Sequence, residues 1–137
     1  LSVMRPSVVR PCALLVAILA AALLPAAASA ARLHLALRRA EPAANAQVAG
    51  PVRELRLWFT QRAELRVTTV KVTDAKGAEV ATGALARGDA ADAPIVAPLK
   101  APLAQGAYTV RWRTMARDGH VVSGGYAFTV TAAAAAR

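Results

Sequence analysis

The stretch that most constrains the fold lies near the carboxyl end of the chain. Large apolar side chains at Tyr108, Val110 and Trp112 alternate with threonine and arginine. A period of two is typical of a half-buried β-strand, and the same period returns shortly before the end of the chain. A turn-forming Asp-Gly pair separates the two segments. We therefore expect neighbouring strands at residues 108–116 and 121–130.

Shorter segments of strand character precede this pair. Residues 52–61 alternate, with leucines and a phenylalanine on one face, and residues 65–73 are rich in valine and threonine, which favours a strand. A hairpin turn at 74–77 leads to a return strand at 79–82, and residues 95–99 form a short strand between prolines. With about seven short strands and no long helical period, the sequence predicts an all-β fold, an antiparallel β-sandwich.

Two features are expected to interrupt the regular sheets. Gly124 and Gly125 lie side by side in the last strand, and paired glycines there predict a β-bulge. Residues 83–93 combine small and charged side chains, which is typical of a loop.

The first part of the chain has the pattern of a secretory signal peptide. Arg5 and Arg10 form the positive end, residues 13–24 the apolar stretch, and residues 28–30 a cleavage site of small residues. A membrane anchor is the alternative, but the apolar run is shorter than the ~20 residues that a spanning helix needs. The chain is therefore expected to divide into a signal peptide (1–31), a domain without a membrane span (32–131) and an alanine-rich tail (132–137).

The net charge of +9 raises the question of an acidic partner. The basic residues alternate with apolar ones along the predicted strands, as they would on solvent faces. Because they do not cluster in the sequence and export is indicated, we expect no nucleic acid partner and favour an anionic membrane or partner surface. These cations are Arg38, Arg53, Arg56, Arg66, Lys71, Arg111 and Arg113.

The single cysteine, Cys12, lies within the predicted signal peptide. The domain that remains after cleavage would have no disulfide, so its core must hold it together. The same absence excludes a cysteine-based zinc or copper(I) site in that domain.

Asp118 and His120 are the candidate metal ligands. They are two residues apart, so in extended backbone their side chains point to the same side. The chain has one other histidine, His34, near the start of the predicted domain. An Asp-Gly-His sequence is most often only a turn, so the residues alone leave both a plain turn and a metal site open.

Several motifs together resemble those of the CopC copper-resistance proteins of the bacterial periplasm, over roughly residues 34–130. The matching segments are His34-x-x-Leu37, Glu41-Pro42-Ala43, Val70-Lys71-Val72-Thr73-Asp74-x-x-Gly77, Gly106-x-Tyr108-Thr109-Val110-x-Trp112-Arg113 and Asp118-Gly119-His120-x-Val122-Ser123-Gly124.

This resemblance implies an immunoglobulin-like β-sandwich or Greek-key barrel that is periplasmic and binds one copper(II) ion. The implied metal ligands are His34, Asp118 and His120, together with the amino group of an N-terminal histidine. Copper(II) prefers such nitrogen and oxygen donors in a tetragonal plane. An inner-membrane copper transport protein is a further partner that the resemblance suggests.

The sequence departs from the family pattern in two places. Leu33 precedes His34, whereas family members usually begin with the histidine. Cleavage after Ala31 would place His34 third, where the amine, two deprotonated amides and the imidazole can bind copper(II). Met115 is the only methionine of the predicted domain, so a thioether copper(I) site is not expected.

Three functional classes follow. A copper(II) carrier or buffer without turnover is favoured, so the protein is not expected to be an enzyme. A copper oxidase with a histidine-brace-like site would need an open coordination position and a substrate face. A metal-free immunoglobulin-like scaffold module is the third class.

Overall fold

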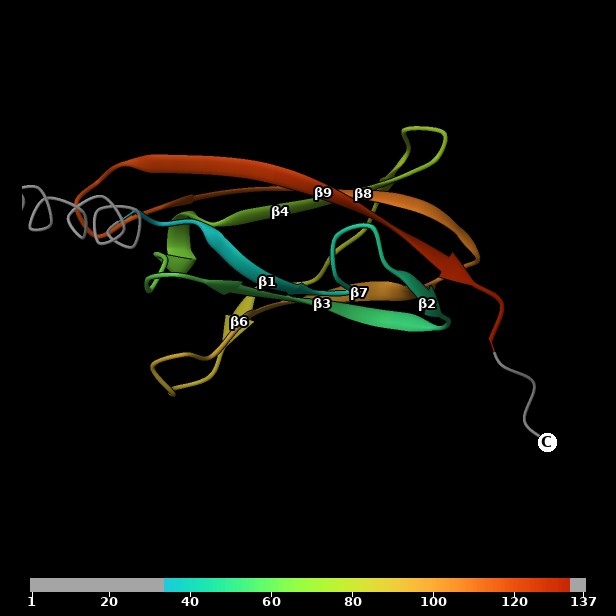
Figure 1. The fold of residues 1–137 in the computed structure, drawn as a ribbon, viewed down its shortest axis with the longest axis horizontal. Coiled ribbons are helices and arrows are strands. Elements are labelled where there is room, and N and C mark those ends of the chain that lie inside the picture. Colours follow the sequence, from blue (N-terminus) through green and yellow to red (C-terminus); the bar gives the residue numbers. More distant parts are fainter. Residues whose placement is uncertain (1–33, 134–137) are drawn as a thin grey trace, which may run out of the picture. The chain divides into compact units, whose positions relative to one another are not determined.

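The computed structural model describes residues 34–133, and almost every ordered element in them is a β-strand (Figure 1). A single 3-10 turn, η1 (Leu65–Val67), lies among the strands. The strands are β1 (Leu37–Glu41), β2 (Gln47–Ala49), β3 (Val52–Phe59), β4 (Thr69–Asp74), β5 (Glu79–Val80), β6 (Ala86–Arg87), β7 (Ile95–Leu103), β8 (Gly106–Met115) and β9 (Val121–Thr131).

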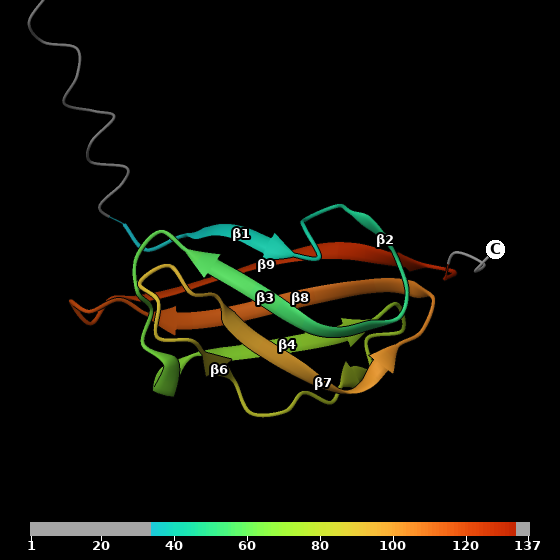
Figure 2. The same ribbon diagram turned by 90° about the horizontal axis from the view of Figure 1, so that it is seen from below.

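The strands form two sheets that lie face to face, as Figure 2 shows. One sheet has the order β1-β3-β7-β6 and the other β2-β9-β8-β4-β5. All pairings are antiparallel except β2 with β9, which is parallel. The predicted all-β sandwich is therefore confirmed, with one parallel pairing that the sequence did not indicate.

The core fills the space between the sheets with the apolar faces of the alternating strands. Leu55 and Leu57 of β3 are fully buried and belong to the same cluster as Val110 of β8. The rings of Phe59 and Trp112 join the two sheets in an edge-to-face contact at 5.1 Å between centroids. Such a contact adds to the gain from burial, so alternation in the sequence translates directly into sandwich packing.

The predicted β-bulge at Gly124 and Gly125 is wrong, because β8 and β9 pair without a register shift from end to end. Gly124 lies opposite Trp112, and a Cβ there would come within 2.6 Å of the indole Cζ2. A Cβ on Gly125 would lie 2.9 Å from the carbonyl oxygen of Val110. The glycines thus make room for β8 and its tryptophan.

The strand predicted at 65–73 begins later, at Thr69. The Thr68 hydroxyl donates to the Glu64 carbonyl at 2.7 Å and contacts the buried Thr114 hydroxyl at 2.6 Å. These bonds stabilise η1, so residues 65–67 form a 3-10 turn and not the start of the predicted strand.

Further bounds differ from those predicted. β5 ends at Val80 instead of Thr82, and β3 ends at Phe59 instead of Gln61. β7 continues to Leu103 instead of ending at Leu99, and the predicted loop at 83–93 contains the two-residue strand β6. The extension of β7 pairs Leu103 with Val52 of β3, a partner distant in sequence that local patterns do not reveal. β6 pairs with the following strand, β7.

The predicted signal peptide at 1–31 lies outside the described residues, as do the last four residues of the predicted tail. Across residues 34–133, no helix has the length and apolarity to cross a membrane.

Candidate metal centre

The hairpin between β8 and β9 carries the candidate ligands Asp118 and His120. The Ala116 N–H donates to the His120 carbonyl at 2.9 Å, and the Gly119 N–H donates to the Ala116 carbonyl at 2.9 Å. Gly119 has a φ of +88°, a left-handed conformation that glycine adopts without a Cβ penalty. The turn is therefore closed by its own backbone at the end of a long ladder.

The structure brings the Asp118 and His120 side chains into direct contact. Asp118 Oδ2 lies 2.9 Å from His120 Nδ1, and Asp118 Oδ1 accepts the His120 backbone N–H at 3.1 Å. We expected extended backbone to align the two side chains, but they meet across a turn. Both are largely exposed, with 64% of the aspartate and 83% of the histidine side chain open to solvent.

This contact shifts the pKa values of Asp118 and His120 in opposite directions. The hydrogen bond from His120 lowers the pKa of Asp118 below its ordinary value of 3.8. The hydrogen bond to Asp118, with the attraction of its negative charge, raises the pKa of His120 above 6.5. Each group therefore favours the charged form of the other.

The same contact fixes which imidazole nitrogen can bind a metal. Because Nδ1 faces the carboxylate, the remaining ring nitrogen is Nε2, and across residues 34–133 no hydrogen bond engages it. A carboxylate on the far nitrogen orients a metal-binding imidazole and raises its basicity. In this geometry the pair offers one oriented nitrogen donor, Nε2, of a kind that suits copper(II), and the Asp118 carboxylate can bind the same ion only if it leaves Nδ1.

His34 is exposed, and Thr60 anchors the chain around it. The Thr60 hydroxyl donates to the His34 carbonyl at 2.7 Å and accepts the Ala36 N–H at 3.0 Å. The Thr60 N–H donates in turn to the Ala36 carbonyl at 2.9 Å. Three hydrogen bonds thus fix the residues around His34 at the end of β3.

The start of the described chain lies at the same end of the sandwich as the Asp118 turn, as Figures 1 and 2 both show. Leu35 is 96% buried in a small apolar cluster that includes Ala116, the residue that follows the end of β8. His34 and Asp118 are close in sequence to these two packed residues. This packing places both candidate regions at one end of the fold.

The structure brings two of the three candidate ligands together and leaves the third separate. Across residues 34–133, no three His, Cys, Asp or Glu side chains form a group that could hold a metal. The full set of His34, Asp118 and His120 stays a prediction. Thr60 is a positioning residue that the sequence did not reveal, since it acts over 26 residues of separation.

The other notable residues of β8 and β9 either pack into the fold or lie on its surface. Trp112 and Tyr108 are buried in the core, as predicted, and Met115 is half-buried on β8. Ser123 is exposed on β9, and its cross-strand partner is Arg113.

Comparison with known proteins identifies the domain. The family model of the CopC domain matches residues 37–131. Copper resistance protein C of Escherichia coli is 30% identical over 121 residues, covering 83% of this chain and 94% of that protein. Protein YobA of Escherichia coli K12 is 33% identical over 97 residues, which cover 71% of this chain and 78% of that protein.

Solved structures agree with these relatives. CopC from Methylosinus trichosporium OB3b superposes with a TM-score of 0.66 and 29% identity, covering 72% of this chain and 95% of that one. PcoC, a methionine-rich copper resistance protein from Escherichia coli, gives a TM-score of 0.63 and 29% identity, covering 72% of this chain and 99% of that one. Sandwich, hairpin motif and family match agree, and the chain belongs to the CopC family of copper-resistance proteins.

Proposed function

We propose that the protein is a periplasmic copper(II)-binding protein that carries or buffers one ion in copper resistance and turns over no substrate. The observation that carries this proposal is the 2.9 Å contact between Asp118 Oδ2 and His120 Nδ1. It presents an oriented imidazole Nε2 at an exposed turn, where an ion can enter and leave. Copper is the cargo of such a site.

The remaining donors of the proposed site come from the start of the domain. Thr60 and the buried Leu35 hold the chain next to His34 at the end of the sandwich that carries the hairpin. The His34 imidazole and the amino group of the processed chain would complete a nitrogen and oxygen set. If processing leaves Arg32 first, the amine and two amides bind together with His34.

The proposed site favours copper(II) over copper(I). Its donors are imidazole, amine and carboxylate, whereas copper(I) prefers soft sulfur ligands. The one methionine near the hairpin, Met115, is half-buried on β8. We therefore expect a reductant to weaken binding.

The oxidase alternative gains no support from the described residues. Its substrate face would need exposed aromatic side chains beside the hairpin, but Trp112 and Tyr108 both pack into the core. Delivery to an inner-membrane copper transport protein fits a carrier role, and it is part of the proposal.

The test is a competition titration of copper(II) with a chromogenic chelator on the exported protein. We expect one ion per chain, an affinity loss of at least about 100-fold for His34→Ala and for His120→Ala, and about 10- to 100-fold for Asp118→Ala. Asp89→Ala, in an exposed loop, is the matched carboxylate control and should have no effect.

Acid should also weaken binding, because the amine and both imidazoles bind only when deprotonated. The affinity should fall as the pH drops through the histidine range near ~6.5. Native affinity in the His34→Ala, His120→Ala double variant would contradict the proposal. So would copper(I) binding as tight as copper(II) under anaerobic conditions.

A further inference from the structure

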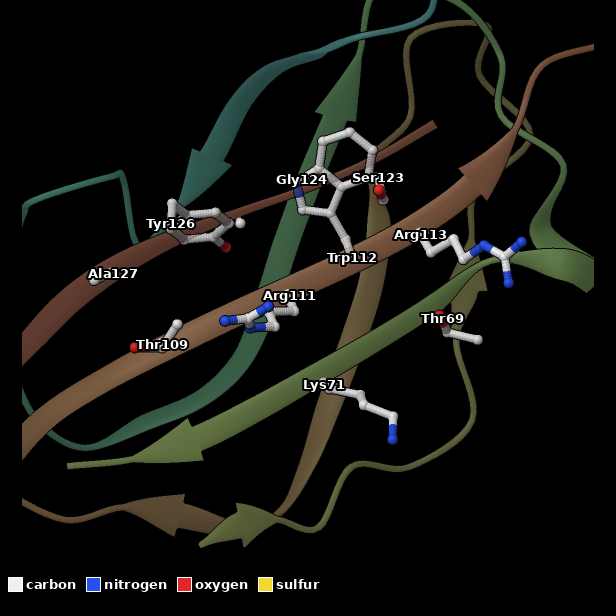
Figure 3. Close-up of a pocket in the computed structure, with 11 residues that line it drawn as sticks. Thr69, Lys71, Thr109, Arg111, Trp112, Arg113, Ser123, Gly124, Tyr126 and Ala127 are labelled. Carbon is white, nitrogen blue, oxygen red and sulfur yellow. The ribbon is translucent and has the colours of Figure 1, made fainter. Parts of the chain in front are cut away.

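The outer face of the five-stranded sheet gathers three cations that are separated in the sequence. Lys71 of β4 lies directly opposite Arg111 of β8, and Thr69 lies opposite Arg113. Cross-strand partners share one face of a sheet, so all three cations stand on the same side, as Figure 3 shows. The sequence did not reveal this grouping because it depends on the register of two strands.

These cations have almost no counter-charge within the described part of the chain. Lys71 has one weak partner, Glu79, at 3.7 Å, and both side chains are more than 60% exposed. No ion pair or hydrogen bond engages the side chains of Arg111 and Arg113 across residues 34–133. Like charges placed opposite one another destabilise a sheet, so the Lys71–Arg111 pair lowers the stability of this one.

The cations border a shallow groove with a volume of about 670 Å³ over β4, β8 and β9. Gly125 lies opposite Arg111 and contributes no side chain, so the floor of the groove is low there. Among the described residues that line the groove, none carries a carboxylate. The groove is therefore a positively charged hollow with room for backbone to approach the sheet.

An apolar border separates this groove from the metal hairpin. Val121 follows His120 directly, lies opposite Met115 and is 53% exposed. Ser123 and Arg113 form the next pair along the same face. A partner bound in the groove would thus contact the residue next to the proposed copper ligand.

We propose that this face docks an acidic, extended segment of a partner protein. Arg111 and Arg113 are two residues apart on one strand, so their Cα atoms are about 7 Å apart. That is also the spacing of every second side chain in an extended partner, so carboxylates at alternate positions match both arginines. Arginine forms bidentate hydrogen bonds with such carboxylates.

A lipid surface fits the face less well. Anionic bilayers are typically bound by clusters of about four to eight cations that reach a flat surface. Here three cations surround a hollow, and the rings of Trp112 and Tyr126 pack inward against the core and not out toward a bilayer. The shape and the charge both favour a protein segment.

The test measures binding of a fluorescent peptide of about ten residues, alternating Glu and Ser, to the metal-free exported protein. We expect saturable binding that weakens with salt and is lost when Gln replaces Glu. The Arg111→Gln, Arg113→Gln double variant should bind about 3- to 10-fold more weakly. The Arg38→Gln, Arg53→Gln double variant removes the same charge from exposed positions in β1 and β3 and should change binding less than about 2-fold.

Stability separates a docking role from a structural one. Removing a charge opposite Lys71 should leave the unfolding temperature of Arg111→Gln unchanged or slightly raised. Equal weakening by both double variants would overturn the proposal, because it would show attraction to net charge alone. The absence of saturable peptide binding would overturn the proposal as well. So would binding to phosphatidylglycerol vesicles, used as a second probe, by a protein that does not bind the peptide. Copper is absent throughout, so failure here is separate from failure of the proposed metal site.

Discussion

Two turns in this domain share one backbone design and use their aspartate differently. In the β4–β5 turn, the Asp74 N–H donates to the Ala78 carbonyl, and the Gly77 N–H donates to the Asp74 carbonyl. The β8–β9 turn repeats both bonds between Ala116, Gly119 and His120. The glycine has a φ of +81° in the first turn and +88° in the second.

The position of the carboxylate within the turn decides its role. Asp74 opens its turn, and its Oδ1 accepts the backbone N–H groups of Lys76 and Ala78, both at 2.9 Å. Asp118 is the third residue of its turn and faces the side chain of His120. The first carboxylate accepts two backbone N–H groups, whereas the second accepts one and also orients an imidazole. The position of the aspartate in the turn therefore decides whether it can serve a metal site.

The support behind the two turns differs as well. β4 and β5 pair only over Val72↔Val80 and Thr73↔Glu79. β8 and β9 pair from Met115↔Val121 to Gly106↔Val130. The long ladder holds the Asp118 turn on a rigid base, and rigid elements position site residues more precisely than loops do.

The largest expected effect comes from breaking that ladder. Gly124→Ala would place a Cβ 2.6 Å from the Trp112 ring, and we expect the free energy of unfolding to fall by about 1–3 kcal/mol through overpacking. Chemical denaturation measures this loss. Gly88→Ala is the control, because its Cβ would meet only an ordinary contact at 3.6 Å. Equal stability of both variants would show that the glycine does not serve the ladder.

A smaller effect separates the two aspartates. Asp74→Ala removes two hydrogen bonds to the backbone and should cost about 1–2 kcal/mol of stability with no change in copper(II) affinity. Asp118→Ala should leave the unfolding midpoint essentially unchanged, because its contact with His120 is exposed, and should weaken copper(II) binding. The reverse pattern in denaturation and copper titration would remove the distinction between the turns.

The smallest effect is electrostatic and specific to the second turn. Asp118→Asn should lower the pKa of His120 towards 6.5 in the metal-free protein, as followed by the imidazole proton resonances in NMR. The ion pair stabilises the folded state between the lowered pKa of Asp118 and the raised pKa of His120. It is lost in acid as Asp118 protonates and in base as His120 deprotonates. An unchanged His120 midpoint would mean that the contact is absent in solution.

Local pattern predicted what depends on neighbours in sequence. The alternation around Tyr108 and Trp112 gave β8, and the Asp118 turn placed two candidate ligands together. The role of Gly124 was missed, because a glycine pair indicates a bulge as readily as space for a cross-strand tryptophan. The anchoring of His34 by Thr60 could not be predicted, since a hydrogen bond over 26 residues leaves no local pattern.

The central claim is that one copper(II) ion joins the start of the domain to the Asp118 turn. Pulsed electron paramagnetic resonance on the copper(II)-loaded protein counts the imidazoles bound to the ion. The account predicts two imidazoles in the native protein and one in each of His34→Ala and His120→Ala. An unchanged imidazole count in the His34→Ala variant would contradict it, because the hairpin would then bind copper without the chain start.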